Sequence, residues 1–335
     1  MDYSFVSGQV RAKEASLLSV SQLDRMIGAP TPEAAFSVMS ELVYADYFDD
    51  TVSAADFGKV IQQGLAETKH MIQAGSGDAP ELGIIWLKFD VNNLKRALKI
   101  KLLEGANTIE DFSEDNGFSR LGNLDQAALE AIVFNAQPAG NIATPLWMAV
   151  NQASDILDQN GQEFRFVEYA LDKAYFQAIE SLDGLYPSYF LANLKAWLIE
   201  STNFRMTARS ILSHGTKVPA TAWIDGGNLY HADVEKLETA DDFIRWASST
   251  RFASSVADLQ DAEDKALTLT QIEKGLDKAY QQFLSEASMG EVASVQIPYA
   301  YFEKRMANAR LLKFVMFAKL NGLDSDTIYK TLETF

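Results

Sequence analysis

The sequence predicts an all-α fold. Hydrophobic residues recur near the 3.6-residue period of helices through most of the 335 residues, and strand-like patterns are confined to 84–85 and 292–297. With 47% hydrophobic residues, the chain can bury a sizeable core. These observations predict helical bundles. A basic helical segment also occurs three times, at 86–105, 197–215 and 301–322.

Two features with the same spacing indicate an internal repeat. Asn93, Asn203 and Asn308 lie at the centres of the three basic segments, 110 and 105 residues apart. The pentapeptide L-D-K-A-Y begins at Leu171 and recurs 105 residues later. A long repeat overrides the length-based expectation of about two domains. We therefore predict three helical repeats, at 1–115, 116–222 and 223–335.

Each expected helix follows from its hydrophobic period and its breakers. Segment 3–27 ends at an Ala-Pro-Thr-Pro stretch, where the threonine can cap a second helix at 33–48. A third helix, 57–74, precedes the first basic segment, and the acidic, glycine-containing stretch 104–123 follows that segment as the first boundary. A proline and a glycine pair place the second boundary at 215–234. The remaining expected helices are 125–135, 145–159, 164–182, 239–250, 253–287 and 324–335.

The composition excludes several classes of function. The chain has no cysteine, which excludes disulfides, thiolate metal sites and a cysteine nucleophile. A net charge of −17 argues against nucleic-acid binding and direct lipid insertion, because phosphate groups are repelled. The first residues lack the apolar core of a signal peptide, and no apolar run approaches the roughly 20 residues of a membrane span. We expect a cytoplasmic protein.

The basic segments stand out against this acidic background. The first contains five basic and two acidic residues, and the third contains five basic residues and one acidic residue. A charge run is usually a solvated face, but repeat-equivalent positions favour a shared basic surface. In the third copy Phe314 replaces the basic residue found at the equivalent place in the other two. We predict partner contacts for Lys95, Arg96, Lys99, Arg205, Arg209, Arg310 and Lys313.

Polar residues at the centres of these segments point to a structural role. Asparagine is unfavourable inside a helix, so its repeated use indicates buried hydrogen bonding, with direct partner contact as the alternative. An acidic residue lies three positions before the asparagine in the first two copies, whereas the third copy has Arg305 there. We assign structural roles to Asp90, Asn93, Glu200, Asn203 and Asn308.

No catalytic motif is apparent. The three histidines lack metal-ligand spacing, and neither a phosphate-binding Walker A loop nor a G-x-S-x-G elbow is present. The carboxylates Asp46, Asp49 and Asp50 allow the alternative of an all-α, metal-dependent enzyme. Turn and capping roles explain this cluster better. We expect no catalytic residue, metal or cofactor.

Four motifs along the chain carry a family resemblance. They are V-R-A-K-E-A-S-L-L from Val10, P-E-A-A-F-S-V-M-S-E-L-V-Y-A-D-Y from Pro32, F-D-V-N-N-L-K from Phe89 and E-K-R-M-A-N-A-R from Glu303. In this order and spacing they resemble the C-subunit family of V-type/A-type ATPases, whose eukaryotic members are called d subunits. The resemblance covers the full chain and includes the threefold repeat.

The resemblance implies a non-catalytic subunit of the central stalk. Such proteins form a pseudo-threefold funnel of three helical domains on the cytoplasmic face of the membrane rotor ring of c/K-type subunits. The funnel is a socket for the coiled-coil shaft subunit and its small companion, and it couples ATP hydrolysis or synthesis to proton or sodium transport. The implied location is cytoplasmic and peripheral to the membrane. The alternative is a helical-repeat scaffold for an unrelated soluble partner.

Overall fold

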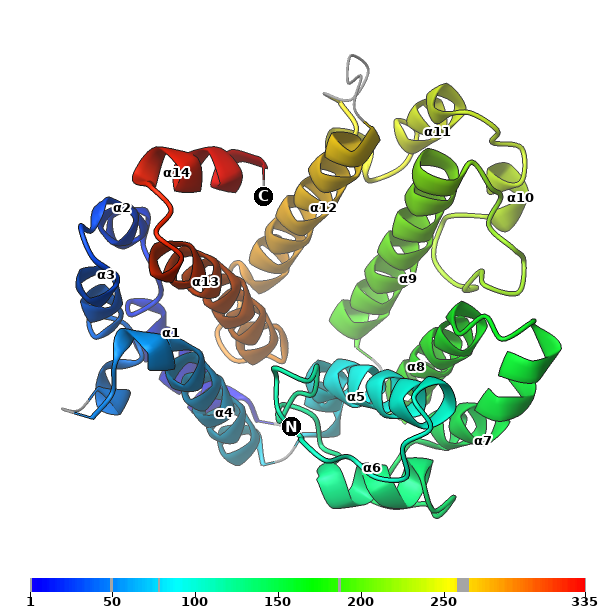
Figure 1. Cartoon of the computed structure of the whole chain (residues 1–335), viewed down its shortest axis with the longest axis horizontal. Coiled ribbons are helices and arrows are strands. Elements are labelled where there is room, and N and C mark those ends of the chain that lie inside the picture. Colours follow the sequence, from blue (N-terminus) through cyan, green and yellow to red (C-terminus); the bar gives the residue numbers. More distant parts are fainter. Residues whose placement is uncertain (1, 49–50, 78, 186–187, 258–264, 335) are drawn as a thin grey trace. The chain divides into compact units, whose positions relative to one another are not determined.

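A computed structural model describes residues 2–48, 51–77, 79–185, 188–257 and 265–334. Every regular element in these residues is a helix and none is a strand, which confirms the all-α prediction (Figure 1). Two units are formed. The central unit is Pro80–Arg251, and the terminal unit joins Met1–Ala79 to Phe252–Phe335.

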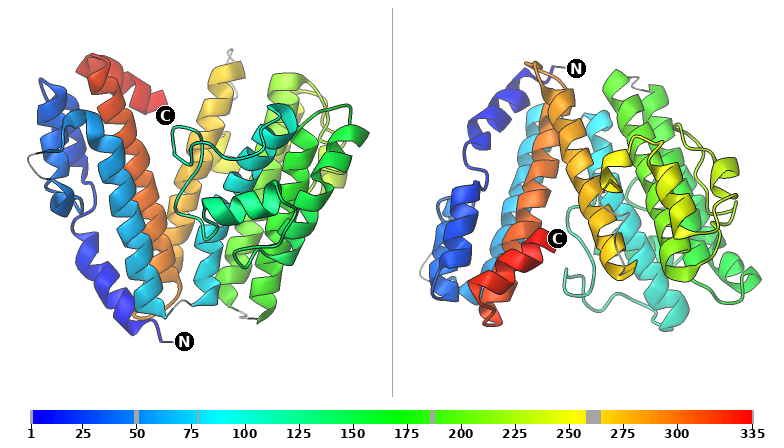
Figure 2. Two further views of the ribbon diagram at one scale, coloured as in Figure 1. Left: turned by 60° about the horizontal axis from the view of Figure 1, so that its bottom comes forward. Right: turned by 90° about the horizontal axis from the view of Figure 1, so that it is seen from above.

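The terminal unit is organised around helix α13. Its α-helices are α1 (Ser4–Glu14), α2 (Val20–Gly28), α3 (Pro32–Met39), α4 (Phe57–Ser76), α12 (Lys265–Ser288), α13 (Gln296–Leu320) and α14 (Ser325–Thr334). Helix α13 contacts α1, α2, α3, α4 and α12, and it runs beside α4 in both Figure 1 and Figure 2. The two ends of the chain are joined by hydrogen bonds, because Lys319 Nζ donates to Ala29 O at 2.9 Å and Ser325 Oγ to Ile27 O at 2.6 Å.

The central unit packs α5 against the helices that follow it. Its α-helices are α5 (Gly83–Leu103), α6 (Gln126–Val133), α7 (Thr144–Gln159), α8 (Arg165–Leu185), α9 (Tyr189–Arg209), α10 (His231–Val234) and α11 (Ala240–Ala247). Leu94 and Leu98 of α5 are buried in one core with Leu129 of α6 and Leu171 of α8. Removal of such leucines from water is the main term that stabilises the unit.

Local signals explain where the helices depart from the expected bounds. The single helix expected at 3–27 is two helices, because Ser19 and Gln22 form a capping box that starts α2. Helix α13 begins at Gln296, so Pro298 lies in its first turn, where a missing N–H leaves no helical hydrogen bond unmade. The helix expected at 253–287 is α12 preceded by the short 3-10 helix Ala253–Ser255.

The boundaries of the two structural units differ from the repeat boundaries that the sequence period predicts. Helix α5 was expected to close the first repeat, yet it contacts α6, α7 and α8 of the second. Helix α13 of the third expected repeat contacts α1, α3 and α4 of the first. Each of these basic helices therefore packs against helices outside its own expected repeat. The division into 1–115, 116–222 and 223–335 stays a prediction from the sequence period.

Candidate partner interface

The polar pair at the centre of α5 holds the loop that follows this helix. Asn93 is fully buried, and its side chain makes two hydrogen bonds of 2.8 Å with the backbone of Ser119, one to the carbonyl and one from the N–H. Asp90 Oδ1 accepts from Leu124 N at 2.8 Å. Gly122 lies against this carboxylate, since a Cβ there would be 2.3 Å from Asp90 Oδ1. The helix thus fixes the backbone of the loop through two buried side chains.

Helix α9 repeats this arrangement. Asn203 is also fully buried, donates to Ile224 O at 2.8 Å and accepts from Ile224 N at 3.1 Å. Glu200 Oε1 accepts from the backbone N–H of Asn228 at 2.8 Å. Gly227 leaves room for Glu200, because a Cβ there would lie 2.7 Å from Glu200 Cγ. Gly122 and Gly227 are 105 residues apart, close to the 110 residues that separate Asn93 from Asn203.

The third copy keeps the asparagine and changes the acidic position. With its amide turned to satisfy both partners, Asn308 donates to Lys304 O and accepts from Leu18 N, each at 2.8 Å. The loop that it holds is therefore the connection between α1 and α2, near the other end of the chain. Arg305 stands where the other copies have a carboxylate, and it is buried.

Three of the predicted contact residues line one cavity in the central unit. Lys95 of α5 and the α9 residues Arg205 and Arg209 lie around a cavity of about 720 Å³. Two further basic side chains, Arg165 and Lys217, also line it. The carboxylates that line this cavity are Glu168 and Asp172. In a chain of net charge −17, this basic cavity is a local excess of positive charge that attracts carboxylate or phosphate groups.

The aspartates of the repeated pentapeptide pair with the basic helices. Asp172 Oδ1 is 2.6 Å from Lys95 Nζ, and both side chains are partly buried. Asp277, at the same place in the second pentapeptide, lies 3.6 Å from Arg310, where both side chains are more than half exposed. Screening makes the second pair weak. The pentapeptide thus marks ion-pair partners of the basic helices.

The other predicted contact residues are placed differently. Arg96 donates to Asn116 O and to Glu104 Oε1, both at 2.9 Å, so its guanidinium ties the loop after α5 to the helix. Lys99 is exposed and has no hydrogen bond or ion pair in the part of the chain that the structure describes. Lys313 of α13 is half-buried and belongs to the terminal unit.

Several residues of the basic cavity were missed in the sequence. Arg165, Tyr169, His214 and Lys217 line it, yet they lie outside the repeated segments or at their very ends. The structure marks one end of the cavity, because α9 continues into a π-helical turn, Ser210–His214, that ends at Gly215 in a left-handed conformation. Single π turns are frequent at functional sites.

The carboxylate cluster considered for an enzyme has only one described member. Asp46 lies in the 3-10 helix Ala45–Tyr47, whereas Asp49 and Asp50 lie outside the described residues. Across the described residues, no three histidine or acidic side chains are grouped closely enough to hold a metal ion. Nor is any described helix long and apolar enough to cross a membrane.

A comparison with protein families shows which family this chain belongs to. Residues 6–331 match the model of the family described as ATP synthase (C/AC39) subunit. The chain belongs to this family. A search of curated proteins finds no individual match. The C/AC39 family comprises structural subunits of V/A-type ATPase complexes, so this family member works as part of such a complex.

Proposed function

We propose that this C/AC39 family member is a non-catalytic central-stalk subunit that couples the rotating shaft of a V/A-type ATPase to its membrane rotor ring. The proposed arrangement is a pseudo-threefold funnel of the repeats 1–115, 116–222 and 223–335. Its proposed partners are the coiled-coil shaft subunit with its small companion, and the ring of c/K-type subunits. It would sit on the cytoplasmic side and reach the membrane through the ring.

The observation that carries this proposal is the basic cavity of the central unit. Three of its five lysine and arginine residues come from two repeat-equivalent helices, and Lys95 of α5 corresponds to Arg205 of α9. A protein of net charge −17 gains little attraction to acidic partners except through such a local basic surface. In the terminal unit the candidates are Arg310, at the equivalent position of α13, and Lys313 of the same helix. We therefore propose that these basic residues contact carboxylate and carbonyl groups of the shaft or the ring.

Charge reversal in the cavity tests the proposal. Arg205→Glu and Arg209→Glu replace attraction by repulsion, so we expect binding to the shaft subunits or to the ring to weaken at least about tenfold, about 1.4 kcal/mol. The loss should shrink at high ionic strength because salt screens exposed charges. Lys236→Glu is the matched control, since this exposed lysine of the central unit does not line the cavity. Circular dichroism checks that each variant is folded.

Capture from detergent-solubilised membranes tests the assignment of partners. The tagged chain should recover shaft and ring subunits of an ATPase, and the charge-reversed variants should recover less of at least one of them. Recovery of an unrelated soluble protein without any ATPase subunit would favour the alternative of a helical-repeat scaffold. Unchanged recovery of both partners by the variants would show that the basic cavity is not the interface.

A further inference from the structure

A buried arginine that has no carboxylate partner among the described residues marks a second cavity, in the terminal unit. Arg305 is 2% exposed, and its Nε donates to Thr68 Oγ1 at 3.4 Å. Its guanidinium lies over the ring of Tyr44, 4.6 Å from the ring centroid. No carboxylate of the described residues lies within ion-pair distance of it. A buried charge without an ion-pair partner is unfavourable unless other contacts compensate for it, and a ligand can supply such contacts.

This arginine is also the point where the third repeat departs from the other two. Asp90 and Glu200 use their buried carboxylates to hold a loop backbone. Arg305 has the opposite charge at the equivalent position and holds no loop in this way. The change therefore replaces a loop contact with a cation at the wall of a cavity, which the proposed socket function does not explain.

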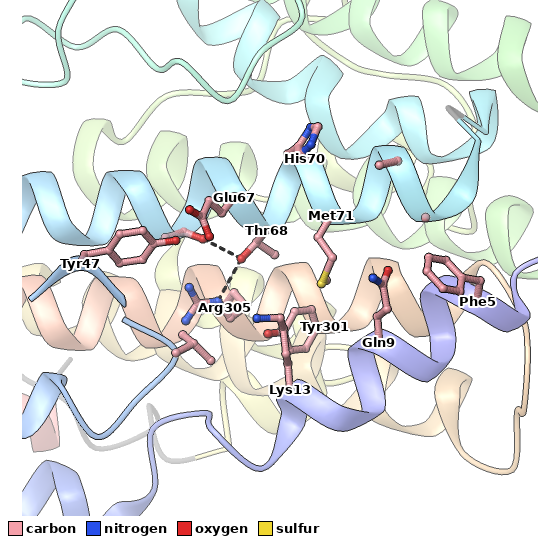
Figure 3. Close-up of a pocket in the computed structure, with 14 residues that line it drawn as sticks. Phe5, Gln9, Lys13, Tyr47, Glu67, Thr68, His70, Met71, Tyr301 and Arg305 are labelled. Carbon is pink, nitrogen blue, oxygen red and sulfur yellow. Dashed lines mark hydrogen bonds between the residues drawn. The ribbon is translucent and has the colours of Figure 1, made fainter. Parts of the chain in front are cut away.

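The cavity lies between α1, α4 and α13 (Figure 3) and has a volume of about 460 Å³. Cavities of about 300–1,000 Å³ hold small molecules. Figure 3 shows Tyr47 and Glu67 at one end, with Phe5 at the other and Met71 between them. The cavity thus offers polar groups near Arg305, and farther along it has the apolar Met71 and Phe5 with the polar Gln9 between them.

Two further polar groups at the cavity are suited to a ligand. Gln9 Oε1 is buried and has no hydrogen-bond partner in the described structure, although Gln9 lines the cavity. Burial raises the pKa of Tyr301, so its hydroxyl stays protonated at neutral pH and can donate. An arginine that donates, a tyrosine that donates and an amide oxygen that accepts are typical parts of a small-molecule site.

The charges of the lining select the class of ligand. Arg305 and Lys13 are positive and Glu67 is negative, so these three side chains give the lining one net positive charge. Glu67 is exposed, and burial together with this nearby carboxylate raises the pKa of Tyr47. The planar guanidinium presents paired donors that match the two oxygens of a carboxylate. One net charge matches a monoanion better than a phosphate dianion.

We propose that this cavity binds a small monocarboxylate with an apolar body. Its carboxylate would take the donors of Arg305 and Tyr301, and its body would lie against Met71 and Phe5. The site is separate from the basic cavity and independent of the proposed socket function.

Binding of defined probes to the full chain tests this proposal. Phenylacetate and hexanoate should bind saturably in calorimetry and raise the melting temperature. The neutral amides, phenylacetamide and hexanamide, have the same bodies and should bind at least tenfold more weakly. Inorganic phosphate should not compete. Equal binding of acids and amides, or binding of phosphate alone, would overturn the assignment.

Two variants separate a binding role from a packing role. Arg305→Met removes the cation but keeps a long side chain, so carboxylate affinity should fall at least tenfold while the ligand-free melting temperature does not fall. Met71→Trp fills the cavity from α4 without touching the arginine and should also abolish carboxylate binding. This variant tests the proposal if Arg305→Met does not fold. Met148→Trp, at an exposed methionine of the central unit, is the control. Wild-type affinity in the folded variants would refute the proposal.

Discussion

The asparagine of α9 offers a sharp test of how the loop after this helix is held. Asn203→Ala removes both hydrogen bonds to Ile224, whose backbone N–H and C=O then stay buried without partners. Each unsatisfied buried group costs about 1–3 kcal/mol. We therefore expect a loss of about 3 kcal/mol in the free energy of unfolding. A loss of that size lowers the melting temperature of a unit of 150–250 residues by about 6–12 °C.

Two measurements check this expectation. Urea unfolding followed by circular dichroism gives the change in stability, and hydrogen exchange at the Ile224 amide reports whether the loop is released from the helix. Asn193→Ala is the matched control on the same helix, since among the described residues its side chain bonds only to Tyr189 O of its own helix. The control should stay within about 0.5 kcal/mol of wild type. The reasoning is wrong if Asn203→Ala is as stable as the control, or if exchange at Ile224 is unchanged.

Two further predictions concern stability. Gly122→Ala places a Cβ 2.3 Å from Asp90 Oδ1 and should destabilise the protein by about 1–3 kcal/mol in urea unfolding. Gly8→Ala is the control: a Cβ there meets nothing within 4 Å, so this variant should be about 0.5–1 kcal/mol more stable than wild type. If Gly122→Ala were the more stable variant, this packing would be contradicted. Lys59 and Ser53 hold the pKa of Asp56 at about 2 in the folded chain, below its usual value of 3.8. The stabilisation from Asp56 is therefore present above pH 4 and lost as the pH falls towards 2. Asp56→Asn should flatten the decline in melting temperature over this pH range, and an unchanged decline would contradict it.

Local sequence signals were sufficient for most of the helices and for the family. The period of apolar residues gave helices close to α4, α7 and α8. Helix ends were harder to place because they depend on side-chain caps. The Ser19 and Gln22 pair that starts α2 is visible in the sequence, yet the apolar period alone runs through it. The family motifs were sufficient because their order and spacing extend over the whole chain.

The candidate site was predictable only in part. Lys95, Arg205 and Arg209 were selected from their equivalent positions, and the structure brings them to one cavity. Arg96 has the same charge and spacing, but it turns to Asn116 O in its own loop. Charge and spacing place a residue on a helix, whereas its partner depends on how the following loop folds back.

The sequence by itself determined the all-α class and the repeated basic helices, because these follow from local period and spacing. It indicated buried hydrogen bonding for the asparagines, and Asn93 and Asn203 are buried whereas Asn308 is half-buried. Only the tertiary structure decided what each helix packs against. It joins α13 to the first helices of the chain, and it leaves Arg305 buried beside a cavity with no carboxylate partner among the described residues. The physical reason is that the apolar face of one helix can pack against that of many others, so the sequence of a helix does not specify its neighbour. The pairing that buries them best is a property of the whole unit, and the partners of buried charges follow from it.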